Sequence, residues 1–112
     1  MKIIKSKISI EELKEMSQNM FGDLVKAVVD VERKIMAINA ELHSDEEALL
    51  INDGSKQENL WGINIYPEKE EEMIEFDSMI NLRPSQENRS RGVDDPKIQK
   101  LIIEITKNLI TR

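Results

Sequence analysis

One segment near the C-terminus constrains the fold of this chain more than any other. Asp94 or Asp95 can cap a helix that has Pro96 at its first position, and the apolar residues that follow recur at helical spacing. They are Ile98, Leu101, Ile102, Ile105 and Leu109. The pattern predicts a helix over residues 96–110 with one apolar face, which has to pack against an apolar surface elsewhere in the chain.

Four β-type segments can supply that surface. Residues 25–31 and 35–40 are rich in β-branched and apolar residues and are separated by three polar residues, which predicts a β-hairpin. Residues 61–66 and 74–82 each alternate apolar and polar side chains, as half-buried strands do. We expect this second pair to be antiparallel across the acidic loop 67–73, with Pro84 ending the last strand.

The N-terminal part of the chain predicts a second helix. Ser9 and Glu12 form a capping-box pattern, and apolar residues at helical spacing follow it. We expect a helix over residues 10–21 that ends near Gly22. Together these segments predict an α+β fold, with a mainly antiparallel sheet of about four to five strands and an N-terminal and a C-terminal helix packed on one face.

Residues 41–51 allow two interpretations. Ser44 and Glu47 again have capping-box spacing, which favours a helix. The apolar run 48–51 before the turn residues Asp53 and Gly54 favours a strand instead. We favour a strand from about residue 47 to 51.

Size and composition limit the class of protein. With 112 residues the chain has the length of one domain, spanning residues 1–112. It contains no cysteine, which excludes disulfides, thiolate metal sites and a cysteine nucleophile and fits a reducing compartment. We find no signal-peptide pattern and no apolar stretch of about 20 residues, so we expect a cytoplasmic protein that does not engage a membrane.

Charge is distributed unevenly along the chain. The net charge is −6, and only four residues are aromatic, so binding to nucleic acid is not expected. Residues 41–77 contain twelve acidic residues against two lysines, which gives −10, whereas residues 78–91 contain three arginines against one glutamate, which gives +2. The arginine-containing segment is therefore the candidate for binding an anion.

This segment, residues 83–92, is a polar loop between a predicted strand and a predicted helix. Guanidinium groups are suited to carboxylate or phosphate, and neutral side chains in the loop can add hydrogen bonds. Our leading hypothesis is a small-ligand or anion-binding module with its site at this loop and the end of the preceding strand. The candidate residues are Arg83, Ser85, Gln86, Asn88, Arg89, Ser90, Arg91, Asp77 and Asn81. The alternative is that the arginines neutralise the acidic segment 68–77 and that the serines and asparagine make turns.

His43 is the only histidine and a weaker candidate for chemistry. Its near-neutral pKa suits acid–base catalysis, with Glu41, Glu75 or Asp77 as a carboxylate partner. A lone histidine among acidic residues is more often an ordinary surface or hydrogen-bonded residue. No ligand spacing predicts a metal site, no nucleophile motif is present, and the sequence specifies no cofactor.

The second hypothesis, which we rank above an acid–base role of His43, is an interaction protein. Ile103 and Ile110 lie off the apolar stripe of the predicted C-terminal helix, and we expect them to be exposed. A homodimer or a complex with a partner protein could form through this helix or through an exposed strand edge.

Four blocks of sequence resemble a family of short prokaryotic proteins known only as a domain of unknown function. They are Met20–Asp30; Glu41–His43 with Asp45–Glu47; Asp53–Gln57 leading to Leu60–Asn64; and Phe76–Asn81 with Arg83–Gln86 and Asn88–Arg91. The resemblance covers nearly the whole chain and implies a complete, stand-alone protein. It implies no activity, cofactor or partner.

Overall fold

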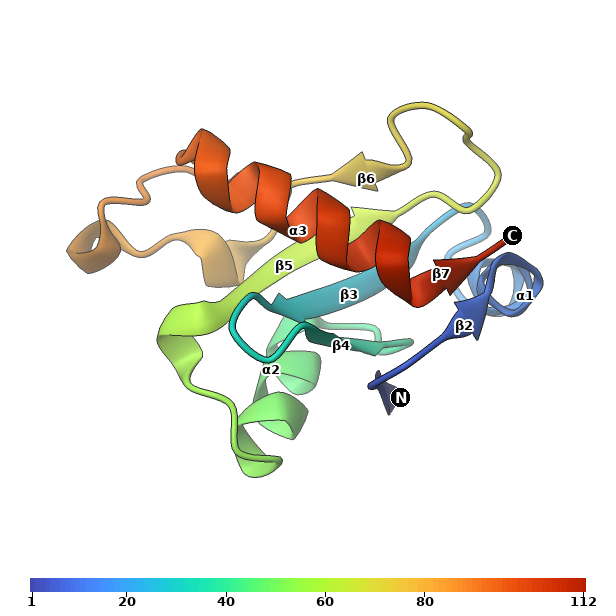
Figure 1. Cartoon of the computed structure of the whole chain (residues 1–112), viewed down its shortest axis with the longest axis horizontal. Helices are drawn as coiled ribbons and strands as arrows, with labels where there is room; N and C mark the ends of the chain where they lie inside the picture. The colour runs from blue at the N-terminus through green and yellow to red at the C-terminus, as the bar shows by residue number, and fades with distance from the viewer.

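A computed structural model describes residues 1–112 and shows one antiparallel sheet flanked by helices (Figure 1). The sheet has five strands in the order β1-β4-β3-β5-β6. Their bounds are Lys2–Ile4 for β1, Ile35–Ile38 for β4, Val25–Asp30 for β3, Leu60–Ile65 for β5 and Ile74–Glu75 for β6. Two further short strands, β2 (Ile8–Ser9) and β7 (Ile110–Thr111), pair in parallel near the chain ends. The predicted α+β class with an antiparallel sheet is confirmed.

The predicted hairpin forms the centre of this sheet. β3 and β4 are antiparallel, with Ala27 opposite Ile38. The turn between them lacks an Asn-Gly or Asp-Gly pair, and a buried carboxylate organises it instead. Asp30 Oδ1 accepts hydrogen bonds from the backbone N–H groups of Glu32 and Arg33, both at 2.9 Å. Such a side-chain-to-backbone turn lets the hairpin close without a glycine.

Two predicted helices cover one face of the sheet. α1 (Ile10–Asn19) begins where Ser9 Oγ accepts from the backbone N–H of Glu12 at 3.1 Å. The chain turns away at Gly22, whose φ of +95° is accessible to glycine without strain. α3 (Pro96–Leu109) begins at Asp95, which accepts from the N–H of Lys97 at 2.8 Å. Both helices start at the caps that the sequence predicts.

The main core lies between these helices and the sheet. It contains 18 buried residues, including Leu13 from α1, Ile102 and Ile105 from α3, and alternate residues of the strands. The sheet contributes Val25, Ala27, Val29, Met36, Ile38, Trp61, Ile63 and Ile65. The period-2 alternation therefore places one set of strand residues against α1 and α3 and leaves the other set on the opposite face.

The strand that we favoured for residues 47–51 is wrong, because this segment is helical. α2 (His43–Asn52) packs on the face of the sheet opposite α3 (Figure 1). The apolar run that suggested a strand is only partly buried: Leu50 is fully buried, whereas Ile51 is 43% exposed. The residues that face inward are His43, Glu46 and Leu50, at helical spacing. Because two of these are polar, the apolar pattern did not reveal the buried face.

The predicted strand 74–82 is also much shorter than expected. It pairs antiparallel with β5 as predicted, but only Ile74 and Glu75 are in the ladder. The chain then passes over Gly62 of β5 on the α2 face, and a Cβ added at Gly62 would lie 2.5 Å from Ser78 Cβ. The missing side chain of Gly62 makes room for this crossing. The chain also contains three short 3-10 helices: η1 (Gln57–Asn59) directly before β5, and η2 (Met79–Asn81) and η3 (Pro84–Gln86) after β6.

None of the helices has the length and apolar character needed to cross a membrane.

Candidate functional site

A groove of about 270 Å³ lies on the face of the sheet that α2 covers. It is bounded by the sheet, by the start of α2 and by the segment after β6 that passes over Gly62, which we call the crossing segment. Its lining comes from β3, α2, β5, the segment around η2, and the polar loop. The residues are Lys26, Leu42, His43, Ser44, Asn64, Asp77, Ser78, Met79, Ile80 and Arg91. We call this the α2 groove. It brings together three of the candidates predicted from sequence, His43, Asp77 and Arg91, from separate parts of the chain.

His43 is held in the groove by a hydrogen bond to the sheet. The side chain is only 8% exposed, and Nε2 lies 2.7 Å from the carbonyl oxygen of Ile63. A carbonyl only accepts, so Nε2 donates and carries the proton of the neutral ring. Nδ1 then presents a lone pair and makes no hydrogen bond within the chain. The geometry fixes which nitrogen can accept a proton or a hydrogen bond.

Burial also fixes the charge of His43. It is the main cause that lowers the pKa of this histidine below 6.5, and Lys26 and Arg91 lower it further. The hydrogen bond to Ile63 and the charge of Asp77 oppose this shift. His43 is therefore neutral at pH 7. The structure contains no group of three or more potential ligands that could hold a metal ion.

Two cations and one carboxylate charge the groove. Arg91 Nε forms an ion pair with Asp77 Oδ1 at 2.7 Å, which leaves its two terminal nitrogens without a partner in the chain. Lys26 extends from β3, with its Nζ 5.1 Å from the ring centroid of Phe21. The three charges, +1, +1 and −1, sum to +1 within a protein whose net charge is −6. The α2 groove is a local positive site.

The N-terminus of α2 adds to this positive character. Its N-cap residue is Leu42, which has no side-chain oxygen to accept from the first turn. The backbone N–H groups of His43 and Ser44 have no partner in the chain. Unpaired N–H groups at the positive end of a helix dipole favour an anion.

Glu46 lies behind His43, one helical turn along α2, and is completely buried. Its Oε2 accepts from the backbone N–H of Ala40 at 3.0 Å, and its Oε1 has no partner. Burial raises the pKa of this carboxyl group to about 9, against smaller opposing effects of the Ala40 hydrogen bond and Lys26. Glu46 is therefore protonated at neutral pH and adds no negative charge beside the groove.

The predicted arginine loop divides into residues with different roles in the structure. Arg83 binds the protein itself: its guanidinium donates to the carbonyl oxygen of Gln57 at 2.7 Å and to that of Leu60, and lies 4.1 Å from the ring centroid of Trp61. These contacts attach the loop to the start of β5. Arg83 is not among the residues that line the α2 groove.

The amide and hydroxyl side chains of the loop also make internal bonds. Asn88 is 3% exposed, donates to the carbonyl of Asn81 at 2.7 Å and accepts from the N–H of Asp94 at 2.8 Å. Ser90 Oγ donates to Asp94 Oδ1 at 2.6 Å. Asn81 itself is fully buried against Gly62. These side chains shape the turns that present Arg91.

Three other predicted site residues are exposed on the loop. Gln86 donates to the carbonyl of Glu58 at 3.1 Å, whereas the side chains of Ser85 and Arg89 make no hydrogen bond within the chain. None of the three lines the α2 groove. Of the three loop arginines, only Arg91 reaches this groove.

Lys26, Leu42 and Met79 also line the groove and were not predicted from the sequence. Lys26 had a usable signal, because it alternates with the core residues Val25 and Ala27 and so had to lie on the opposite face of the sheet. Leu42 and Met79 had none, since their positions depend on α2 and on the crossing segment.

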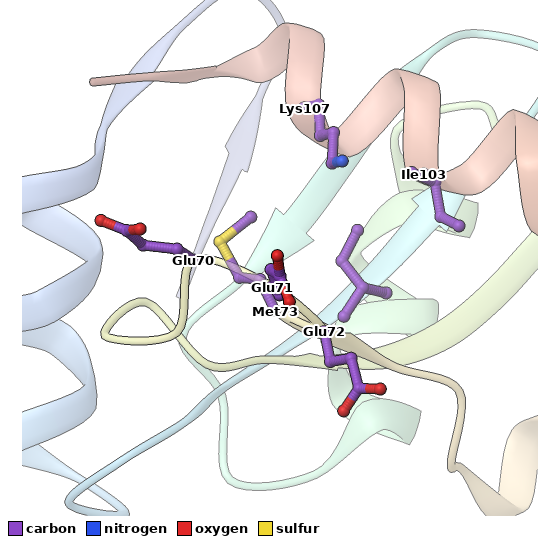
Figure 2. A pocket seen from close by; sticks show the side chains of 7 residues that line it. Glu70, Glu71, Glu72, Met73, Ile103 and Lys107 are labelled. Carbon is purple, nitrogen blue, oxygen red and sulfur yellow. The ribbon is translucent and has the colours of Figure 1, made fainter.

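A second hollow lies between the acidic loop and α3. Figure 2 shows Ile103 and Lys107 on α3 beside the loop that contains Glu70, Glu71, Glu72 and Met73. This side of α3 is the surface that the sequence offered for self-association. Ile103 is half-buried there, but Ile110 is only 9% exposed because it pairs with β2, so its predicted exposure is wrong.

The chain has an α+β fold with a sheet covered on both faces and a polar groove on its α2 face. Comparison with family models gives a match over residues 2–109 to a family described as "Protein of unknown function (DUF5674)", and the chain belongs to this family. The resemblance seen in the sequence is thereby confirmed. No curated protein and no solved structure matches the chain.

Proposed function

We propose that the protein binds a small anionic ligand in the α2 groove. The observation that carries the proposal is the convergence of Lys26, Arg91 and the unpaired N–H groups of the α2 N-terminus on one groove. Each of these groups favours negative charge. Their clustering contrasts with the acidic character of the chain as a whole.

Asp77 has a positioning role in this proposal. Its ion pair with Arg91 uses Nε and directs the guanidinium, while both terminal nitrogens stay free for a ligand. Asp77 and Arg91 are both about half exposed, so the pair by itself adds little stability. In this proposal the ion pair serves to orient the guanidinium group of Arg91 toward the groove.

Neutral His43 contributes a hydrogen-bond acceptor. Its Nδ1 is the one unpaired nitrogen of a side chain that is otherwise buried and fixed. A ligand with an N–H or O–H group near its anion can donate to this atom. The groove thus combines charge recognition with one directional contact.

Thermal unfolding in the presence of candidate ligands tests the proposal. The panel consists of inorganic phosphate, phosphorylated metabolites, nucleotides and small carboxylates. A ligand that binds only the native state, at about 100 times its dissociation constant, stabilises it by about 2.7 kcal/mol, which raises the midpoint by on the order of ten degrees.

Two arginines of the same loop provide a matched comparison. Arg91→Ala removes a groove cation, and Arg89→Ala removes an exposed cation outside the groove. We expect Arg91→Ala and Lys26→Ala to abolish the ligand-induced rise and Arg89→Ala to preserve it. If Arg89→Ala abolished the ligand-induced rise of the midpoint as well, the ligand would be attracted by general charge and not bound in the groove. If Arg91→Ala left this rise unchanged, the proposed site would be overturned.

Acid–base catalysis by His43 is a second candidate, favoured by its fixed tautomer. A neutral imidazole with one nitrogen anchored to a backbone carbonyl and the other free is suited to accept a proton from a bound substrate. His43→Gln should then abolish turnover of a ligand found in the panel while binding is retained. Turnover that survives this change would remove His43 as the base.

A further inference from the structure

Two exposed apolar residues, which we call the apolar rim, line the α2 groove together with its charged groups. They are Leu42, which is 55% exposed, and Met79, which is 63% exposed. The two residues belong to separate elements, the N-cap of α2 and η2. Single exposed apolar side chains are common on protein surfaces, but these two border the same groove as Lys26 and Arg91.

Leu42 is an unfavourable residue at its position. N-cap positions favour Ser, Thr, Asp and Asn, which bond the free N–H groups, and an apolar residue there loses that bond. Here the N–H groups of His43 and Ser44 stay unpaired and a leucine side chain faces solvent. A ligand with an acceptor and an apolar part would satisfy both features together.

Met79 is suited to contact an apolar group of variable shape. Its side chain is flexible and polarizable, and such residues are common where binding surfaces adapt to their ligand. Ile80, next in the chain, is half-buried and also lines the groove. The volume of about 270 Å³ is slightly below the range of roughly 300–1,000 Å³ that is usual for ligand pockets, which suits a compact molecule.

We propose that the ligand of the α2 groove is an amphipathic anion, in which a phosphate or carboxylate is attached to a compact apolar group such as an aromatic ring. The anion binds at the N–H groups of His43 and Ser44 and at Arg91, and the apolar group lies between Leu42 and Met79. This inference rests on the proposed anion-binding function and adds the class of molecule bound.

Two pairs of probes test the inference: inorganic phosphate with phenyl phosphate, and acetate with phenylacetate. Affinities are measured by NMR titration at millimolar concentrations, with the methionine methyl signals as the readout. We expect the aromatic member of at least one pair to bind about tenfold more tightly, which corresponds to roughly 55 Å² of apolar surface removed from water. The pair in which the aromatic member binds more tightly than the simple anion shows whether the anion is a phosphate or a carboxylate.

Variants separate the apolar contact from the ionic one. Met79→Ser and Leu42→Ala should remove the aromatic advantage and leave the affinity for the simple anion unchanged. Met20→Ser is the matched control, because Met20 is a methionine that is 39% exposed and lies outside the groove. The control should keep the full advantage.

The possible failures are distinguishable. Equal affinities within both pairs, with dependence on Arg91 retained, would overturn the amphipathic ligand and leave anion binding intact. Binding of none of the four probes would overturn anion binding and the inference with it. A Met79 methyl signal that changes with protein concentration alone would show that a second copy of the chain covers the rim, and would also overturn the inference.

Discussion

The side-chain amide of Asn81 pairs with both backbone groups of Gly62: Oδ1 accepts from the N–H at 2.8 Å, and Nδ2 donates to the carbonyl oxygen at 3.0 Å. Asn64 and Gly62 are two residues apart on β5, so their backbone groups point to the same edge. β6 pairs with Asn64, but the chain has left the sheet before Gly62. The amide of Asn81 therefore satisfies an edge position that a longer β6 would have occupied.

Asn81→Ala should destabilise the protein by about 2–4 kcal/mol. The change leaves the backbone groups of Gly62 and the carbonyl of Arg91 without their partner in a buried place. Chemical denaturation measures the loss. Ser85→Ala, at an exposed site, is the control and should change stability by less than about 0.5 kcal/mol. A cost below about 1 kcal/mol for Asn81→Ala would contradict the role assigned to this amide.

Gly62→Ala should also destabilise the fold, by about 1–3 kcal/mol, because the new methyl group overlaps Ser78. The cause is space and not backbone conformation, since the φ of Gly62 is not positive. Ser78→Gly removes the atoms that clash, so the double variant should lose less stability than the sum of the two single variants. Additive losses in a double-mutant cycle would show that the close approach of Ser78 is not the constraint.

Glu46→Gln should stabilise the protein at alkaline pH. The pKa of Glu46 is about 9 in the folded state and 4.5 when unperturbed, so between these values the folded state holds a proton that the unfolded state releases. Stability from this group is fully present below about pH 4.5 and is lost as pH rises toward 9. Glutamine keeps the shape without titrating, and we expect a gain on the order of 2–4 kcal/mol at pH 8.

Denaturation curves at pH 5 and pH 8 measure this effect. The advantage of Glu46→Gln over the natural protein should shrink toward pH 5. Asp45→Asn changes the neighbouring exposed acid and is the matched control, with little difference between the two pH values. A Glu46→Gln advantage that is the same at both pH values would mean that the carboxyl group is ionised in the folded protein.

His43 should titrate below pH 6.5, because burial disfavours its charged form. A folded pKa below the unfolded value means that stability from this group is present above about pH 6.5 and is lost as pH falls through the folded pKa. His43 is the only histidine, so its ring signals in an NMR pH titration report the value directly. A midpoint at or above 6.5 would contradict the buried, neutral ring.

Arg83→Lys should destabilise the junction between the polar loop and β5 by about 1–3 kcal/mol. An ammonium group cannot bond the carbonyl oxygens of Gln57 and Leu60 with a planar fork while it stacks on Trp61. Arg89→Lys, on the exposed part of the same loop, should leave stability unchanged. The measurement is the thermal unfolding midpoint of each of the two variants. Equal midpoints would show that the fork geometry of Arg83 is not needed.

Local sequence patterns predicted the elements whose signals lie within a few residues. Ser9 and Asp95 marked the starts of α1 and α3, β-branched and apolar runs marked β3 and β4, and alternation marked β5. A capping oxygen or a period of two is a property of neighbouring residues, so no tertiary contact was needed to recognise it. The same patterns placed the apolar faces of these elements against one core.

The candidate site was only partly visible in the sequence. Asp77 and Arg91 were predicted together as part of an anion-binding site, whereas His43 was predicted separately for acid–base catalysis, with Asp77 as one possible partner. Their meeting in one groove depends on α2 packing on the sheet and on the segment after β6 crossing Gly62. Neither event leaves a periodic pattern in the chain.

The sequence by itself determined the antiparallel sheet, the two capped helices and the family. Only the tertiary structure decided that residues 43–52 form a helix, that Ile74–Glu75 is the whole of β6, and that Arg91, unlike Arg83 and Arg89, reaches the groove. The physical reason is that these outcomes depend on polar contacts between distant residues. Burial of Glu46 and the pairing of Asn81 with Gly62 are such contacts, and hydrophobic periodicity does not encode them.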